Sequence, residues 1–168
     1  PTSHCGSVLL ARVDDGRLGI GDYAFYDCPY LSMVNLGGNI QTIGNYAFYD
    51  CTTLKEVELP TTVTSVGTRA FRNTAAFRSV EAGNGGVVYM GNWAVDFVPI
   101  KNPETSEKGN AVDIDAGTRG IANYTCCNKV ISAVSLPNSL EYICKGAFCN
   151  SSIITSGKIG RASCRERV

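Results

Sequence analysis

The stretch IGDYAFYDC, residues 20–28, returns as IGNYAFYDC at residues 43–51, so the same pattern recurs 23 positions later. A third copy, VGTRAFRN, begins at Val66, again 23 positions further on. Repeats of this length are typical of chains that stack one structural unit on the next. The spacing therefore predicts a solenoid of about 23-residue coils.

Each repeat also contains a segment of the form L-x-x-V-x-L, as in residues 31–36, 54–59 and, less regularly, 77–82. Its alternation of apolar and polar residues predicts a strand with Glu56 and Glu58 facing outward. The Ala-Phe-x-x-Cys segment is too short for an independent helix, so we expect one helical or 3₁₀ turn with Ala and Phe in the core. The fold class is thus an α/β repeat, with parallel strands on one face and short turns opposite.

One insertion interrupts the repeat within residues 83–109. Val66 and the next equivalent residue, Ile121, are 55 positions apart, which is nine more than two repeats. Residues 87–90 and 93–98 flank Gly91-Asn92 and predict a β-hairpin, followed by a polar exposed loop. Coils then resume, and Ile121 and Ile143 are 22 positions apart.

These motifs resemble the BspA-like leucine-rich repeats, above all LKEVELP at residues 54–60 and IGNYAFYDC at residues 43–51. The resemblance covers nearly all of residues 1–158, and its departures include Thr125-Cys126 in place of Ala-Phe. It implies a curved solenoid with strands on the concave face. It also implies a secreted or cell-surface protein that engages host or bacterial ligands.

The last ten residues, 159–168, abandon the repeat and become basic. They resemble one reading frame of a sequencing-adapter oligonucleotide, and we expect them to be a sequencing or assembly artefact. The domain is then a solenoid fragment over residues 1–158, and the natural protein is expected to continue beyond Lys158.

Composition excludes several classes of partner. The 15 basic and 15 acidic residues balance, so no net charge favours nucleic acid or an anionic membrane. No apolar run approaches the roughly 18 residues of a membrane span. We expect neither nucleic-acid binding nor direct membrane insertion by this fragment.

The eight cysteines fall into two main groups, with Cys164 in the suspect tail. Cys5, Cys28 and Cys51 share one repeat position, and we expect packed thiols there, because free cysteine behaves as a small hydrophobe. The other group is Cys126, Cys127, Cys144 and Cys149. Cys127 and Cys149 are one coil apart and could be neighbours, so packing, one disulfide and a metal site all stay open, with packing favoured.

Catalytic chemistry finds little support. The single histidine, His4, lies near the N-terminus, and the sequence contains no nucleophile elbow or phosphate-binding loop. We expect no enzyme activity, no cofactor and no metal.

Two sets of residues are candidates for ligand binding. Outward strand positions align Glu56, Glu58, Glu81 and Asp113 as an acidic stripe, which is either a binding surface or a solvated face. The hairpin carries Tyr89, Trp93 and Phe97, which either anchor a partner or fold back onto the solenoid.

We therefore expect a non-catalytic protein-interaction or adhesion module that binds a protein or glycan ligand outside the cell. One alternative is an accessory or targeting segment of a larger secreted enzyme. Another is a purely structural spacer.

Overall fold

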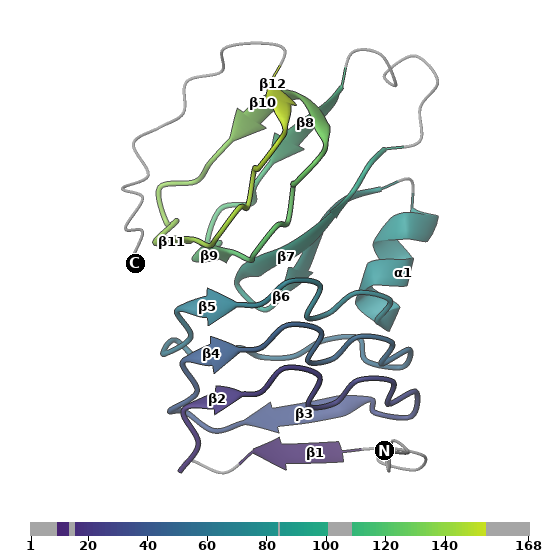
Figure 1. Cartoon of the computed structure of the whole chain (residues 1–168), viewed down its shortest axis with the longest axis vertical. Coiled ribbons are helices and arrows are strands. Elements are labelled where there is room, and N and C mark those ends of the chain that lie inside the picture. The colour runs from purple at the N-terminus through teal and green to yellow at the C-terminus, as the bar shows by residue number, and fades with distance from the viewer. Residues whose placement is uncertain (1–9, 14–15, 84, 101–108, 154–168) are drawn as a thin grey trace.

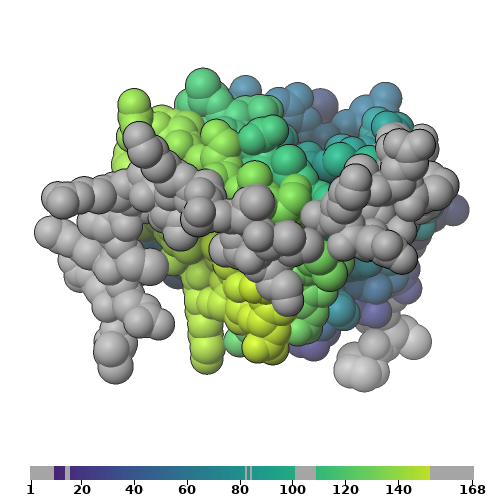
Figure 2. Space-filling model, turned by 90° about the horizontal axis from the view of Figure 1, so that it is seen from above, coloured from purple at the N-terminus to yellow at the C-terminus, as the bar shows by residue number. Residues whose placement is uncertain are grey.

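The computed structural model describes residues 10–13, 16–83, 85–100 and 109–153. Its coils are stacked along the long axis of the molecule, with the N-terminal strands at the bottom of Figure 1 and the C-terminal strands at the top. Seen along that axis in Figure 2, the green and yellow C-terminal coils lie in front of the blue and purple N-terminal coils. The chain is a solenoid, as the repeat predicts.

Each coil offers two strand positions, and the first forms a parallel ladder at each end of the stack. The strands are β1 (Leu10–Val13) and β3 (Met33–Leu36) near the N-terminus, and β8 (Asn110–Asp113), β10 (Val130–Ser135) and β12 (Ser152–Ile153) near the C-terminus. Leu10 pairs with Met33, 23 positions away, and Ala111 pairs with Ala133, 22 positions away. Both predicted coil lengths are confirmed.

The second position forms ladders of two-residue strands. They are β2 (Gly19–Ile20), β4 (Thr42–Ile43), β5 (Ser65–Val66), β9 (Gly120–Ile121) and β11 (Tyr142–Ile143). We number coils 1 to 5 by these short strands. β2, β4 and β5 form one parallel sheet, and β9 pairs in parallel with β11.

The predicted hairpin is confirmed and lies between coils 3 and 4 (Figure 1). Its strands are β6 (Gly86–Met90) and β7 (Trp93–Val98), which pair antiparallel. β7 also pairs in parallel with β9, which gives a sheet of order β11-β9-β7-β6. The insertion is therefore a layer of the stack, while residues 101–108 of the predicted polar loop lie outside the described residues.

The strand pattern fails in coil 3. Residues 54–59 pair with no strand in the described part of the chain, and the predicted strand at 77–82 is wrong because helix α1 (Ala75–Ala82) occupies it. Thr74 explains the helix, since its hydroxyl caps the Phe77 N–H at 3.3 Å and two alanines follow it. The parallel sheet is consequently not continuous along one face.

The segment around Ala-Phe is a chain of linked turns and not a short helix. Tyr26 N–H donates to the Tyr23 carbonyl at 3.1 Å, but Tyr23 and Asp27 have φ angles of 58° and 53°. The same two positions have positive φ in every coil, at Tyr46 and Asp50, Arg69 and Asn73, Tyr124 and Asn128, and Gly146 and Asn150. These left-handed residues flank each turn and prevent it from extending into a helix, so the helical alternative is not observed, whereas the i→i+3 bond of Tyr26 is the hydrogen bond of a single 3₁₀ turn.

The phenylalanines of these turns build the core, as predicted. Phe25, Phe48 and Phe71 form one column, with successive ring centroids 5.1 Å apart. Phe48 is completely buried. The repeat thus places the same side chain at the same depth in successive coils, where each ring packs on the next.

Candidate ligand-binding cleft

Four tyrosines form two adjacent columns on the surface of coils 1 and 2. Tyr23 stacks on Tyr46 with centroids 5.1 Å apart, and Tyr26 stacks on Tyr49 at 5.3 Å. Tyr46 and Tyr49 join the columns at 5.5 Å. Tyr23 and Tyr26 are 56% and 40% exposed, and tyrosine combines an apolar ring with a polar hydroxyl, as binding surfaces often require. We call these four residues the tyrosine patch.

The hydrogen bonds between the turns of neighbouring coils are interrupted between coils 3 and 4. In coil 1, the N–H groups of residues 23, 25 and 27 donate to carbonyls of coil 2 at 2.7 to 2.9 Å, and coils 2 and 4 donate to coils 3 and 5 in the same way. The equivalent N–H groups of coil 3, at residues 69, 71 and 73, have no acceptor among the described residues. Instead, Ala122 N–H of coil 4 donates to Ala94 of β7. Asn123 N–H of coil 4 still donates to the Val66 carbonyl of coil 3 at 2.9 Å, so the two coils stay bonded at this edge, and the inserted strand separates only the turns that follow it.

A cleft of about 340 Å³ opens at this interruption. Tyr46 lines it and connects it with the tyrosine patch, and Tyr124 of coil 4 also lines it and is 40% exposed. Arg69 and Arg72 of coil 3 are further lining residues. The volume falls within the range of about 300 to 1,000 Å³ that is usual for small-ligand sites.

Three cations and one carboxylate line the cleft. Arg72 Nη1 lies 3.1 Å from Asp96 Oδ2, and its guanidinium lies over the Phe77 ring. Burial raises the pKa of Asp96, while the charge of Arg72 opposes this rise. Arg69 and Lys129 form no ion pair with any described residue, so the cleft carries an excess of positive charge.

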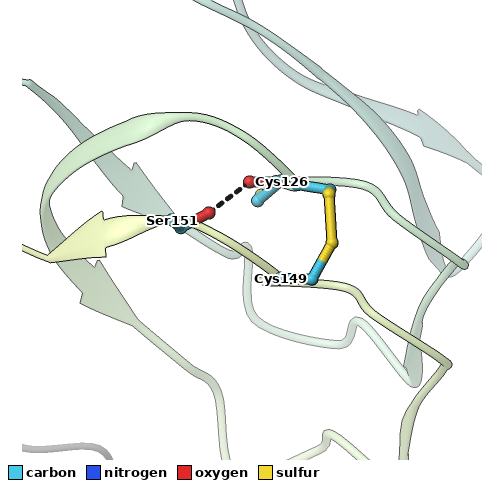
Figure 3. Close-up of a disulfide and its surroundings, with 4 residues drawn as sticks. Cys126, Cys149 and Ser151 are labelled. Atoms are coloured by element: carbon cyan, nitrogen blue, oxygen red, sulfur yellow. Dashed lines mark hydrogen bonds between the residues drawn. A yellow bond between two sulfur atoms is a disulfide. The ribbon is translucent and has the colours of Figure 1, made fainter.

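A disulfide adjoins the cleft. Cys127, a lining residue, is bonded to Cys149 with Cα atoms 4.6 Å apart (Figure 3). The two cysteines occupy the repeat position of Tyr26 and Tyr49. Nearby, the Ser151 hydroxyl donates to the Cys126 carbonyl at 2.5 Å (Figure 3). Of the alternatives that the spacing left open, the disulfide is thus the one formed, and it links coils 4 and 5 covalently.

The other described cysteines differ from one another. Cys51, Cys126 and Cys144 are free thiols. Burial raises the pKa of Cys51 to about 11 and that of Cys126 to about 12, so both are protonated at neutral pH. Cys28 is disulfide-bonded, so the expected packed thiol is wrong at that position, while Cys5 lies outside the described residues.

The acidic residues predicted to bind ligand do not form one stripe. Glu56, Glu58, Glu81 and Asp113 are all exposed, as the alternation predicts. However, Glu81 lies on α1, Asp113 lies on β8, and the segment of Glu56 and Glu58 joins no sheet. Their alignment on neighbouring strands is wrong, although a binding role for individual carboxylates stays a prediction.

The hairpin aromatics pack into the core. Trp93 and Phe97 are 0% and 1% exposed. The Trp93 ring stacks on Tyr142 at 5.9 Å, and the Tyr89 hydroxyl accepts a hydrogen bond from Asp115 N–H at 2.9 Å. Of the two alternatives for this hairpin, folding back onto the solenoid is the one observed.

Within the described ranges, no cluster of three histidine, cysteine or acidic side chains is suited to hold a metal. Likewise, none of the helices described there has the length and apolar character needed to cross a membrane. His4 lies outside these ranges.

Departures from the repeat mark the position of the cleft in the sequence. Arg69 and Arg72 stand in the third copy where Tyr46 and Tyr49 stand in the second. Lys129 occupies the position of the ladder cysteine. Such replacements mark a break in the exposed column, but only the path of β7 shows that they surround one cleft.

The family of the BspA type leucine rich repeat region matches residues 19–116 and 119–163, with 6 copies of the repeat. Among solved structures, the T. pallidum leucine rich repeat protein is 21% identical with a TM-score of 0.45, covering 86% of this chain and 55% of that one. A leucine rich cell surface protein from Faecalibacterium prausnitzii A2-165 is 24% identical with a TM-score of 0.43, covering 87% and 40% respectively. No curated protein matches the sequence.

The chain therefore spans about half the length of these two solved proteins. The family match covers most of the sequence and consists of successive copies of the repeat. This protein belongs to the BspA-type leucine-rich-repeat family.

Proposed function

We propose that this solenoid is a non-catalytic recognition module that acts outside the cell and binds a protein or glycan ligand through the tyrosine patch and the adjoining cleft. The observation that carries the proposal is the exposure of stacked tyrosines directly beside a 340 Å³ cleft. A soluble protein gains little by exposing several ordered aromatic rings together unless a partner covers them.

Rigidity supports the proposal. Backbone hydrogen bonds join the turns that carry the patch, and Asp22 Oδ1 accepts a hydrogen bond from the Asn45 N–H at 2.7 Å. A surface that is already ordered loses little conformational entropy on binding, so more of the contact energy appears as affinity.

The disulfides support an extracellular location. Cys127–Cys149 is formed, and Cys28 is also disulfide-bonded. Such bonds persist mainly in oxidising environments such as the cell exterior, and this agrees with the location that the family resemblance implies.

The proposal is tested by screening the whole chain against arrays of oligosaccharides and purified extracellular proteins, then measuring each captured ligand with two paired variants. Tyr26→Ser with Tyr49→Ser removes half of the tyrosine patch, and Glu56→Gln with Glu58→Gln neutralises the exposed acidic pair. We expect the tyrosine variant to weaken binding at least about tenfold, the effect of losing one good contact. We expect the glutamate variant to bind normally. Binding that depends on the glutamates and not on the tyrosines would overturn the proposed face.

A further inference from the structure

We infer that the cleft between coils 3 and 4 binds an acidic saccharide, with the sugar carboxylate held by Arg69 and Lys129. This inference rests on the proposed function and names the chemical class of its ligand. Its basis is the juxtaposition of two cations that form no ion pair within the described residues, aromatic rings and neutral hydrogen-bonding groups in one cleft.

The charge of the cleft selects an anion. Arg72 already pairs with Asp96 at 3.1 Å, whereas Arg69 and Lys129 remain available. A guanidinium matches a carboxylate in shape and can donate two parallel hydrogen bonds, and an ammonium adds a compact charge. Asp96, whose pKa the charge of Lys129 also lowers, is the one carboxylate that lines the cleft beside three cations, so a ligand carboxylate at Arg69 and Lys129 would balance charge that Asp96 alone does not.

The backbone adds a donor at the same place. The equivalents of the Arg69 N–H in coils 1 and 2 donate to the following coil, but Arg69 N–H has no acceptor in coil 4. A backbone N–H group carries a partial positive charge and needs a hydrogen-bond acceptor. The Arg69 N–H can therefore donate to a carboxylate oxygen that the neighbouring cations attract.

The remaining lining groups favour a sugar ring. Tyr46 and Tyr124 line the cleft from different coils, and aromatic rings pack well against the C–H faces of pyranoses. Thr68, Asn123 and Asn128 supply neutral donors and acceptors of the kind that sugar hydroxyls require. The Tyr124 ring packs against Gly146, where a Cβ atom would lie only 2.6 Å from it.

An acidic peptide fits this site less well. Extended peptides commonly bind by adding a strand to an open sheet edge. The cleft is instead bordered largely by turn segments around Tyr46, Arg69 and Tyr124, each of which has left-handed residues at two positions four residues apart. The N–H groups of residues 69, 71 and 73 are free of acceptors among the described residues, but the left-handed residues Arg69 and Asn73 bend this segment away from the straight edge that an extended peptide pairs with.

The test measures binding of four defined oligosaccharides and one peptide to the whole chain by calorimetry. A glucuronate-containing hyaluronan tetrasaccharide and sialyllactose present a carboxylate on different sugars, and chitotetraose and lactose are neutral counterparts. Hexaglutamate represents an acidic peptide. We expect at least one acidic saccharide to bind about tenfold or more tightly than its neutral counterpart, as expected for one charge-assisted hydrogen bond. Binding of that saccharide should weaken as sodium chloride rises from 50 to 500 mM.

Matched variants locate the site. Arg69→Gln with Lys129→Gln removes the two unpaired cations, and Arg78→Gln with Lys55→Gln removes the same charges from exposed positions that do not line the cleft. The first pair should weaken binding of the acidic saccharide at least about tenfold, and the second should leave it within about twofold. The salt series with the unaltered chain provides a result even if a variant is poorly folded.

Several results would overturn the inference. They are equal affinity for acidic and neutral saccharides, hexaglutamate binding as tightly as the acidic saccharides, unchanged binding by the Arg69 and Lys129 variant, or no saccharide binding at millimolar concentration. If the tyrosine variant still loses a captured ligand while the charge variant keeps it, the proposed function stands and only the acidic-sugar inference fails.

Discussion

Replacing Phe48 by alanine tests the stacked core directly. Phe48 is 0% exposed and lies between Phe25 and Phe71, with ring centroids 5.1 Å away on each side. A buried Phe→Ala change costs about 3–5 kcal/mol of unfolding free energy. Loss of two ring pairs, each worth about 0.5–1.5 kcal/mol beyond burial, places the expected value in the upper part of that range.

The assay is urea unfolding at pH 7 with the disulfides intact, followed by circular dichroism and by fluorescence of Trp93, the single tryptophan, which is fully buried beside β9. A loss of about 4 kcal/mol corresponds to roughly 8–16 °C in melting temperature for a chain of this size. An unchanged dependence on urea concentration would indicate that the variant alters stability and not the extent of unfolding.

Phe25→Ala is the matched control, because Phe25 is only partly buried and stacks on one described ring. It should cost clearly less than Phe48→Ala, about 1–2 kcal/mol. A loss below about 0.5 kcal/mol for Phe48→Ala, which is typical of surface positions, would refute the register. Equal losses for the two variants would refute the argument that stacking on both faces matters.

Three further predictions concern ionisation and the cysteines. Cys127→Ser with Cys149→Ser should lower the free energy of unfolding in urea by about 3 kcal/mol, because the disulfide joins residues 22 positions apart and restricts the unfolded chain. An unchanged midpoint of urea unfolding would show that the disulfide does not stabilise the fold. Iodoacetamide at pH 8 should leave Cys51 and Cys126 unlabelled until urea is added, because pKa values of about 11 and 12 leave about 0.1% thiolate or less. Peptide mass mapping identifies the labelled cysteines. Rapid labelling of either residue in the folded protein would contradict its burial. Burial raises the pKa of Asp96 above 3.8, so the folded state holds this proton more tightly and its stabilising effect is present at low pH and lost as the pH rises through the raised pKa. The stability of the unaltered chain minus that of Asp96→Asn, from urea titrations between pH 3.5 and 7, should therefore fall with increasing pH, and a rising difference would contradict this sign.

The apolar–polar alternation of the sequence predicted the exposure of some candidate binding residues and not of others. The alternation correctly predicted that Glu56 and Glu58 are exposed, because neighbouring residues of an extended chain face opposite sides. It could not predict that Trp93 and Phe97 are both buried, because β7 has neighbours on both of its faces and all six of its residues are buried. Local alternation reports which residues share a face, and only the surroundings decide whether that face is covered.

The same limit applies to coil 3. The pattern of residues 77–82 fits a strand, yet the Thr74 cap and the following alanines favour a helix, and packing of Phe77 against the core accommodates it. Whether such a short segment forms a strand or a helix depends on the residues that pack against it, so its sequence alone does not predict its secondary structure.

The sequence by itself determined the solenoid, the coil length of 22 to 23 residues, the position of the hairpin and the family, because a repeat places identical residues at identical positions in every coil. The tertiary structure alone decided the cleft. Arg69 and Lys129 are 60 positions apart and belong to different coils, and they line one site because β7 separates the turns of coils 3 and 4. A repeat predicts which groups each coil pairs with in its neighbours. Which residues come together where that pairing is interrupted depends on where the inserted strand lies in space.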